Sequence, residues 1–305
     1  MEKRRVVITG LGTVNPLGNN VSASWDAAMA GKCGIGPITQ FDASEFKCKL
    51  AGEVKNFDPE TVVDKKEARK MARFTLLALA DVQIGRDDEV TMLDEEVLPL
   101  LIPYVQQELE APVYGISLGD LVWDNMPFHS VYKEQIRKIG VPVFQVIGNH
   151  DHDRNKYTDR EATENYRNHF GPTYYAFDMG RTHYIVLDDI VYHGAKKYDE
   201  QIDSLQLAWA AEYARRLPAG SRVCVAMHAP AMKAWKGNQV MESAARLMDA
   251  FAGHELHFIT GHTHVNSNYD IREGVVEHNV AQICGNLWYD PINKDGTPKG
   301  YQLFR

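Results

Sequence analysis

The stretch Leu76–Gly85, LLALADVQIG, decides the fold because two incompatible structures can claim it. Leucine and alanine favour a helix, and the upstream residues 66–74, KEARKMARF, have the composition of one. Asp81 and Gln83 instead place a carboxylate and a carboxamide after a short apolar run, as a buried strand does when it delivers ligands to a sheet edge. We expect the strand, because neighbouring strands on both sides commonly override helix propensity.

The composition of the 305 residues argues against several classes of protein. A formal charge of −8 and a pI near 5.8 argue against non-specific nucleic-acid binding, which needs a basic face. The four cysteines lie far apart without a C-x-x-C pair, so neither a zinc knuckle nor a disulfide framework is expected. No run approaches the roughly 18 to 20 apolar residues of a membrane span, and glycines interrupt the apolar start of the chain. We therefore expect a soluble chain without a signal peptide, cytoplasmic by default.

The chain shows two patterns in succession. Up to about residue 80 we expect a strand at 4–10, a helix at 22–31, a short strand at 49–54 and a long amphipathic helix near 65–80. Gly10 and Gly12 suggest a dinucleotide-binding loop, but Asn15 stands where the third glycine belongs, which argues against that site.

From about Phe74 onward, strand-like and helix-like segments alternate, which is typical of a layered α/β domain. Strands are expected at 75–81, 112–120, 141–151, 182–190, 222–230 and 256–264. Helices are expected at 129–140, 203–218 and 239–253, where apolar residues recur at spacings of three and four.

Polar clusters follow five of these apolar runs. They are DVQ at 81–83, GDLVWD at 119–124, GNHD at 148–151, the single His228, and GHTH at 261–264. Taken alone, each has a simpler explanation: Asp81 as a helix cap, His228 as a core histidine, His262 as part of a polar turn. Because the carboxyl ends of strands in open α/β sheets meet at one edge, the five together predict one convergent site.

The amino-terminal segment resembles the opening part of the β-ketoacyl-acyl-carrier-protein synthases, the condensing enzymes of fatty-acid synthesis. The matching residues are RRVVITGLGTVNPLGNN, SWDAAMAGKCGIGPITQFDAS, AGEVKNFDPE and KKEARKM. The resemblance implies an α/β appendage from an incomplete thiolase-like fold, with a domain boundary expected between residues 73 and 74. The catalytic cysteine and histidines of that family have no counterpart later in this chain, so condensing activity is not implied.

The five polar clusters resemble the pattern of the calcineurin-like metallophosphoesterases, which is D-x-H, G-D-x-x-x-D, G-N-H-D/E, a lone histidine and G-H-x-H. The resemblance covers about residues 75–305 and implies a layered α/β fold, a β-sandwich flanked by helices. Carried over residue by residue, it implies that Asp81, Gln83 and His264 hold a first metal ion, that Asn149, His228 and His262 hold a second, and that Asp120 bridges both. It also implies that His150 faces the leaving group, with Asp151 as a plausible partner that orients its ring.

Charge gives this ligand set a chemical purpose. Two divalent ions bring four positive charges, whereas Asp81, Asp120 and a bridging hydroxide bring three negative ones, so the centre attracts a phosphate ester. The ions lower the pKa of the bridging water and stabilise charge on the phosphoryl oxygens. The implied cofactors are two divalent ions, of manganese, magnesium, iron or zinc, and the implied partner is a phosphate ester.

Gln83 departs from the commonest form of the first motif, where a histidine stands. Its carbonyl oxygen can replace an imidazole nitrogen without changing the charge of the site. Because oxygen is the harder ligand, we expect the first metal position to prefer magnesium or manganese over zinc. A side chain that merely points into solvent is the simpler alternative.

Other residues allow weaker expectations. Trp123, Trp288 and Tyr289 either wall a substrate pocket or complete the core, whereas His152 and Asp153 are expected on a solvated loop. Cys224 is expected to be a small buried hydrophobic residue.

Three functions remain open from the sequence. The leading hypothesis is a metal-dependent phosphoesterase. The second is a non-catalytic binding protein or misfolded hybrid in which the displaced amino terminus prevents assembly of the first metal site. The third, remote hypothesis is a fragment that binds acyl-carrier protein. The two resemblances suggest a chimera, and relatives with DGTP-x-GY near residues 295–301 suggest that a further β-rich domain can follow.

Overall fold

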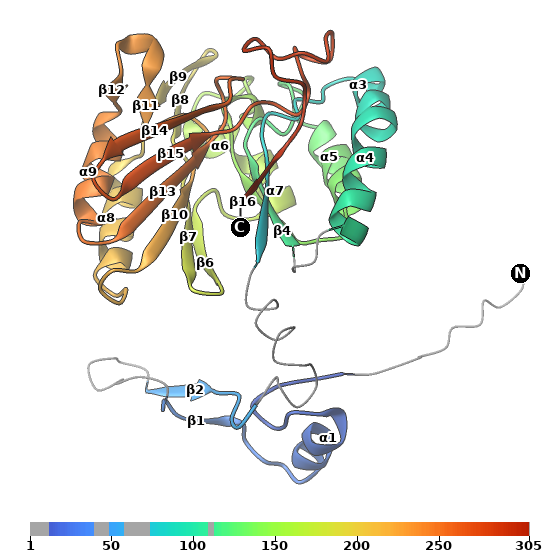
Figure 1. The fold of residues 1–305 in the computed structure, drawn as a ribbon, viewed down its shortest axis with the longest axis vertical. Coiled ribbons are helices and arrows are strands. Elements are labelled where there is room, and N and C mark those ends of the chain that lie inside the picture. The colour runs from blue at the N-terminus through green and yellow to red at the C-terminus, as the bar shows by residue number, and fades with distance from the viewer. Residues whose placement is uncertain (1–11, 40–48, 58–73, 109–112, 305) are drawn as a thin grey trace, which may run out of the picture. The chain divides into compact units, whose positions relative to one another are not determined.

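The computed structural model describes residues 12–39, 49–57, 74–108 and 113–304 (Figure 1). The expected strand at 4–10 and the expected helical residues 65–73 lie outside the described residues, as does Cys48. The chain divides into two compact units, Met1–Ala68 and Arg69–Arg305. The boundary between residues 73 and 74 stays a prediction, because it falls at the edge of an undescribed segment.

The first unit contains one helix and one two-stranded sheet among its described residues. Helix α1, Val21–Met29, begins where the Asn20 side chain accepts a hydrogen bond from the Ala23 backbone N–H, which confirms the expected helix. Strands β1, Ile35–Pro37, and β2, Leu50–Gly52, pair antiparallel, which confirms the short strand. Of the described hydrophobic residues in this unit, Ala27 alone is buried.

The second unit is built on two facing sheets. The first has the order β16-β3-β4-β5, in which β3 (Thr75–Leu79), β4 (Val113–Leu118) and β5 (Val143–Val146) run parallel and β16 (Gln302–Phe304) is antiparallel to β3. The second has the order β14-β15-β13-β10-β7-β6. Its strands are β14 (Ser267–Arg272), β15 (Val275–Asn279), β13 (Glu255–Thr260), β10 (Arg222–Ala226), β7 (Thr182–Val186) and β6 (Tyr175–Met179). All six expected strands are therefore present.

Strand β3 answers the question posed by its leucines and alanines. Every residue of Thr75–Leu79 is buried. Leu76 and Ala78 face the core between the sheets, where Cys224 is also buried, whereas Leu77 and Leu79 face the layer of helices. A strand that is buried on both faces has a continuous apolar sequence without alternation, so its composition resembles that of a buried helix.

Helices cover the outer face of each sheet (Figure 1). On the side of β3 they are α3 (Asp87–Met92), the π-helix η2 (Leu93–Val97), α4 (Leu98–Pro103), the π-helix η3 (Tyr104–Glu108), α5 (Phe128–Arg137) and α7 (Glu164–Phe170), preceded by α6 (Asp159–Ala162). On the side of β10 they are α8 (Ser204–Ala214) and α9 (Glu242–Ala250). The expected layered sandwich flanked by helices is thus confirmed. None of the helices in the described part of the chain is long and apolar enough to span a bilayer.

Short elements lie near the carboxyl ends of the strands. They are the hairpin of β8 (Ile190–Gly194) and β9 (Lys197–Glu200), the hairpin of β11 (Met232–Lys233) and β12 (Gln239–Val240), and the 3-10 helices η4 (Asn149–Asp151) and η5 (Ala234–Lys236). The sequence pattern predicted neither hairpin.

Candidate metal centre

The carboxyl ends of five parallel strands bring together all seven side chains that the sequence implied as ligands. The strands are β3, β4, β5, β10 and β13, and the residues that follow them are Asp81 and Gln83, Asp120, Asn149, His228, and His262 with His264. The structure therefore provides the one convergent site that the order of the motifs predicted.

Asp81, Gln83 and His264 form one group. Asp81 Oδ1 lies 3.2 Å from His264 Nε2, and Gln83 Nε2 lies 3.2 Å from the same nitrogen. Asp81 Oδ2 accepts a hydrogen bond of 2.9 Å from the backbone N–H of His262, which ties the end of β3 to the end of β13.

Asn149, His228 and His262 form a second group around one nitrogen. His228 Nε2 lies 3.1 Å from Asn149 Oδ1 and 3.1 Å from His262 Nδ1. Ligand atoms of Asp120, His228 and His262 all lie within 4.8 Å of one another, which is close enough to surround a single ion.

Asp120 joins the two groups. Its Oδ2 accepts a hydrogen bond of 3.0 Å from Gln83, and its Oδ1 lies 3.3 Å from His228 Nε2. Burial opposes the charge of this carboxylate, but the His228 and His150 rings outweigh burial and hold the pKa of Asp120 well below its usual range. Burial likewise opposes a proton on His228, yet the Asp120 carboxylate raises the pKa of His228 to about 10. This cluster of carboxylates and imidazoles therefore favours a positive charge at its centre.

The donor atoms fit a pair of metal ions. Asp81 Oδ1 is buried and accepts no hydrogen bond from the described residues, although His264 Nε2 lies 3.2 Å from it. His228 Nδ1 donates to the Leu118 carbonyl at 2.7 Å, and His262 Nε2 lies 3.2 Å from Glu200 Oε1. Each ring thus uses one nitrogen to fix its orientation and turns the other inward, as metal-binding histidines do.

The backbone is strained where it delivers these side chains. Asp81, Gln83, Asp120, His262 and His264 all have φ between 50° and 69°, in the left-handed region. Non-glycine residues persist there when the surrounding structure holds them, and such residues cluster at functional sites.

Gln83 reaches the site in an orientation that differs from the expected one. Its amide nitrogen, and not its carbonyl oxygen, faces Asp120 and His264. The carbonyl oxygen accepts from the Cys284 thiol at 3.6 Å. A half-turn of the carboxamide exchanges these two atoms, so the residue type still suits an oxygen ligand, whereas solvent exposure of Gln83 is wrong because its side chain is buried.

His150 stands beside Asp120, but its orienting partner was predicted wrongly. Its Nε2 lies 4.0 Å from Asp120 Oδ2, and its Nδ1 lies 2.7 Å from Asp124 Oδ1. Arg154 holds the same Asp124 oxygen at 2.7 Å, and Trp123 stacks on the imidazole with ring centroids 3.8 Å apart. Asp124, and not Asp151, therefore orients the ring.

Asp151 has a structural task instead. Its buried carboxylate accepts hydrogen bonds from the backbone N–H groups of Leu121, Val122 and Gly148 and contacts His129 Nε2 at 3.2 Å. It therefore fastens the GDLVWD turn to the GNHD turn, which explains why an acid follows His150 without touching its ring.

The remaining expectations divide between core and surface. Trp288 is buried and donates to the Val82 carbonyl, so it completes the core, whereas Tyr289 is exposed. His152 is fully buried and hydrogen-bonds the Gly148 carbonyl, so its assignment to a solvated loop is wrong.

Sequence reasoning missed Glu200 and Lys233. Glu200, at the end of β9, contacts His262 with one oxygen and Lys233 Nζ with the other, at 2.5 Å. The hydrogen bond with His262 lowers the pKa of Glu200 to about 2. No motif marks these residues, because the contact joins positions 62 residues apart in the sequence.

Comparison with known proteins finds two family models that match successive parts of the chain. Residues 74–266 match the family model of the calcineurin-like phosphoesterases, and residues 3–84 match that of the beta-ketoacyl synthase N-terminal domain. The two matches overlap on β3 and the residues that follow it.

Two curated relatives match part of the chain. The 3-oxoacyl-acyl-carrier-protein synthase 2 of Coxiella burnetii is 40% identical over 139 residues, which are 46% of this chain and 31% of that protein. The enzyme of the same name from Synechocystis is 45% identical over 95 residues, which are 31% of this chain and 23% of that protein. The chain thus spans about a third or less of the length of these relatives.

Two solved structures are similar to part of this chain. A dimetal phosphatase from Danio rerio has a TM-score of 0.48 at 13% identity, covering 68% of this chain and 87% of that one. A 5'-nucleotidase from Candida albicans has a TM-score of 0.45 at 12% identity, covering 69% of this chain and 46% of that one. Likenesses this weak say nothing of activity. The match to residues 74–266, however, covers well over half of the chain, so this protein belongs to the calcineurin-like phosphoesterase family and carries in front of it a segment that matches the β-ketoacyl synthase N-terminal domain.

Proposed function

We propose that the second unit hydrolyses a phosphate monoester or diester with the help of two divalent ions. The observation that carries this proposal is the sorting of seven side chains into two groups with Asp120 in contact with both. Asp81, Gln83 and His264 would hold one ion, Asn149, His228 and His262 the other, and Asp120 both. Bound ions would supply Lewis-acid stabilisation of the phosphoryl oxygens and an activated water.

The residues of the chain prepare the site for this reaction. Asp120 and Asp81 supply negative charge in a buried setting, and the backbone strain at both positions directs their carboxylates inward. His228 and His262 have their outer nitrogens engaged, so neither ring needs to rotate before an ion binds. This arrangement lowers the cost of organising the site.

His150 is the candidate general acid. Its Nδ1 lies 2.7 Å from Asp124 Oδ1 and 3.0 Å from Arg154 Nη2, which leaves Nε2 on the side of Asp120 to give a proton to the departing oxygen. The contact with Asp124 and the stacked Trp123 restrict the rotation of the His150 ring. General acid help of this type is worth about a hundredfold to ten-thousandfold in rate.

Hydrolysis of p-nitrophenyl phosphate and bis(p-nitrophenyl) phosphate by the manganese-loaded protein tests the proposal. With glycerol 2-phosphate, whose leaving alkoxide must be protonated, His150→Ala is expected to lower kcat by at least about a hundredfold while metal content is unchanged. His183→Ala is the matched control, because His183 also holds an aspartate, Asp178, at 2.7 Å but lies outside the site. Absence of turnover in the wild type would contradict the proposed hydrolysis. Full turnover in His150→Ala would contradict the proposed role of His150 as general acid.

A further inference from the structure

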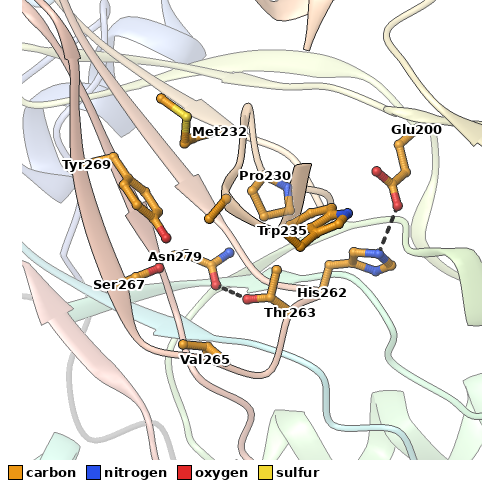
Figure 2. A pocket seen from close by; sticks show the side chains of 11 residues that line it. Glu200, Pro230, Met232, Trp235, His262, Thr263, Val265, Ser267, Tyr269 and Asn279 are labelled. Carbon is orange, nitrogen blue, oxygen red and sulfur yellow. Dashed lines mark hydrogen bonds and ion pairs between the residues drawn. The ribbon is translucent and has the colours of Figure 1, made fainter. Parts of the chain in front are cut away.

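A cavity of about 480 Å³ opens beside the candidate metal centre (Figure 2). It borders His262, so one of the proposed ligands forms part of its wall. The other walls come from the loop after β10, from β11 and η5, and from β14 and β15. Its volume lies within the range of about 300 to 1,000 Å³ that is usual for small-molecule sites.

Aromatic side chains face each other across this cavity. Figure 2 shows Tyr269 on one side and Trp235 with His262 on the other. Trp235 is 51% exposed although Pro230 and Met232 lie near it in the same wall. A half-exposed indole opposite a phenol offers two flat faces to a ring that enters between them.

The charges in the cavity wall are already balanced. Glu200 is the one carboxylate among the lining residues, all of which are described, and it is paired with Lys233 and with His262. No unpaired lysine or arginine lines the cavity, so a second phosphate group would find no cation there. The cavity therefore suits an uncharged group.

Hydrogen-bonding groups remain free at its edge. Within the described part of the chain, the hydroxyls of Ser267 and Tyr269 and the indole N–H of Trp235 have no hydrogen-bond partner. Asn279, by contrast, is held by Thr263, Gly261 and Thr260 and forms a fixed floor. The wall thus combines flat apolar faces with a few polar atoms that can form hydrogen bonds with the edge of a ligand.

We propose that this cavity binds the leaving group of the ester and that this group is an uncharged aromatic ring system with polar edges, the class to which nucleobases belong. The phosphate would lie at the metal centre on the His262 side, and the ring would stack on Trp235. This inference rests on the proposed function. Stacking of a base on an aromatic side chain changes affinity by about fivefold to 150-fold.

The test compares adenosine 5′-monophosphate with glycerol 2-phosphate as substrates. Trp235→Ala is expected to raise KM for the nucleotide at least about fivefold and to leave glycerol 2-phosphate unchanged. Trp235→Phe, which keeps an aromatic face, is expected to have a KM for the nucleotide close to that of the wild type. Trp25→Ala, at an exposed tryptophan of α1 that does not line the cavity, is expected to change neither substrate.

Equilibrium dialysis of adenosine with the metal-free protein separates this inference from the proposed function, because adenosine has no phosphate. Retention of adenosine by the wild type and its loss in Trp235→Ala would support the cavity assignment even if neither ester is hydrolysed. Hydrolysis of both esters without an effect of Trp235→Ala, or failure to retain adenosine, would overturn it. Circular dichroism of each variant shows that a loss does not come from unfolding.

Discussion

At the scale of single residues, the site depends on contacts that the motifs do not reveal. His228 and His262 each turn one nitrogen inward because the other is held, by the Leu118 carbonyl in the first case and by Glu200 in the second. Motifs revealed both histidines, but Glu200 was hidden because it ends a short hairpin that has no apolar pattern. Asp124 was present in the predicted GDLVWD motif, yet only the folded chain shows that it, and not Asp151, faces His150.

Glu200→Gln tests whether the Glu200 carboxylate positions His262. The amide keeps the size of the side chain but loses the charge that opposes Lys233 and that orients the His262 ring. We expect the affinity for manganese to fall about tenfold to a hundredfold in isothermal titration calorimetry. Glu212→Gln is the control, since Glu212 is an exposed acid on α8 that pairs with Arg215 and Arg216. Equal affinities in wild type and Glu200→Gln would show that Glu200 has no such role.

At the scale of elements, the sequence predicted what depends on local pattern and failed where packing decides. The six main strands and the helices at 128–137, 204–214 and 242–250 follow from apolar spacing. Even β3 was correctly expected as a strand, because Asp81 needed a sheet edge. Strand β9 of the β8–β9 hairpin alternates exposed and intermediate residues and carries no apolar run, so the contact of its Glu200 with His262 could not be predicted.

Gly148 shows how tightly β4 and β5 meet at the site. A Cβ atom at this position would lie 2.2 Å from the Asp120 backbone nitrogen and 2.4 Å from its Oδ1. Gly148→Ala is therefore expected to displace Asp120 and to lower both metal content and thermal stability. Gly300→Ala is the control, because the nearest atom to its added methyl, the Pro298 carbonyl oxygen, lies at 3.9 Å. Normal metal content in Gly148→Ala would mean that Asp120 is not needed in its observed place.

Glu277 joins β15 to the loop after His228. Its buried carboxylate accepts hydrogen bonds from the backbone N–H groups of Ala231 and Met232, at 2.7 and 2.8 Å, and from the Thr260 hydroxyl. Burial raises the pKa of Glu277 from 4.5 to about 7. The folded chain therefore binds more protons than the unfolded chain between these two values, so this group makes the folded state less stable as pH rises from 4.5 to 7.

Glu277→Gln removes this titration. As pH rises through that window, the unfolding free energy of the wild type is expected to fall by roughly 3 kcal/mol relative to that of the variant. Urea denaturation followed by tryptophan fluorescence at pH 4.5, 6 and 8 measures it. A difference that stays constant with pH would show that Glu277 is already ionised throughout.

At the scale of the whole molecule, two family segments meet on β3. All seven candidate ligands and His150 lie in the unit Arg69–Arg305. The buried residues of the three hydrophobic clusters all lie at or after Leu76 in the sequence. The alternative of an incomplete first metal site assumed that the displaced amino terminus prevents this site from assembling. The structure instead places Asp81 3.2 Å from His264, so this assumption finds no support in the site.

A chain that begins at Arg69 tests the independence of the second unit. We expect it to fold and to bind the same amount of manganese as the 305-residue chain, with unchanged kcat on p-nitrophenyl phosphate, because all seven candidate ligands and His150 belong to the unit Arg69–Arg305. Atomic absorption and steady-state kinetics on both chains make the comparison. Loss of metal on truncation would show that the first unit contributes to the site.

The central claim is that seven side chains from the ends of five strands hold two divalent ions, and metal stoichiometry tests it most directly. After reconstitution with manganese and removal of free metal, we expect inductively coupled plasma mass spectrometry to find about two ions per chain. Asp120→Asn is expected to lower this number, because the Asp120 carboxylate contacts side chains of both groups. A wild-type protein that retains no divalent ion, or an Asp120→Asn variant that retains as much as the wild type, would contradict the claim.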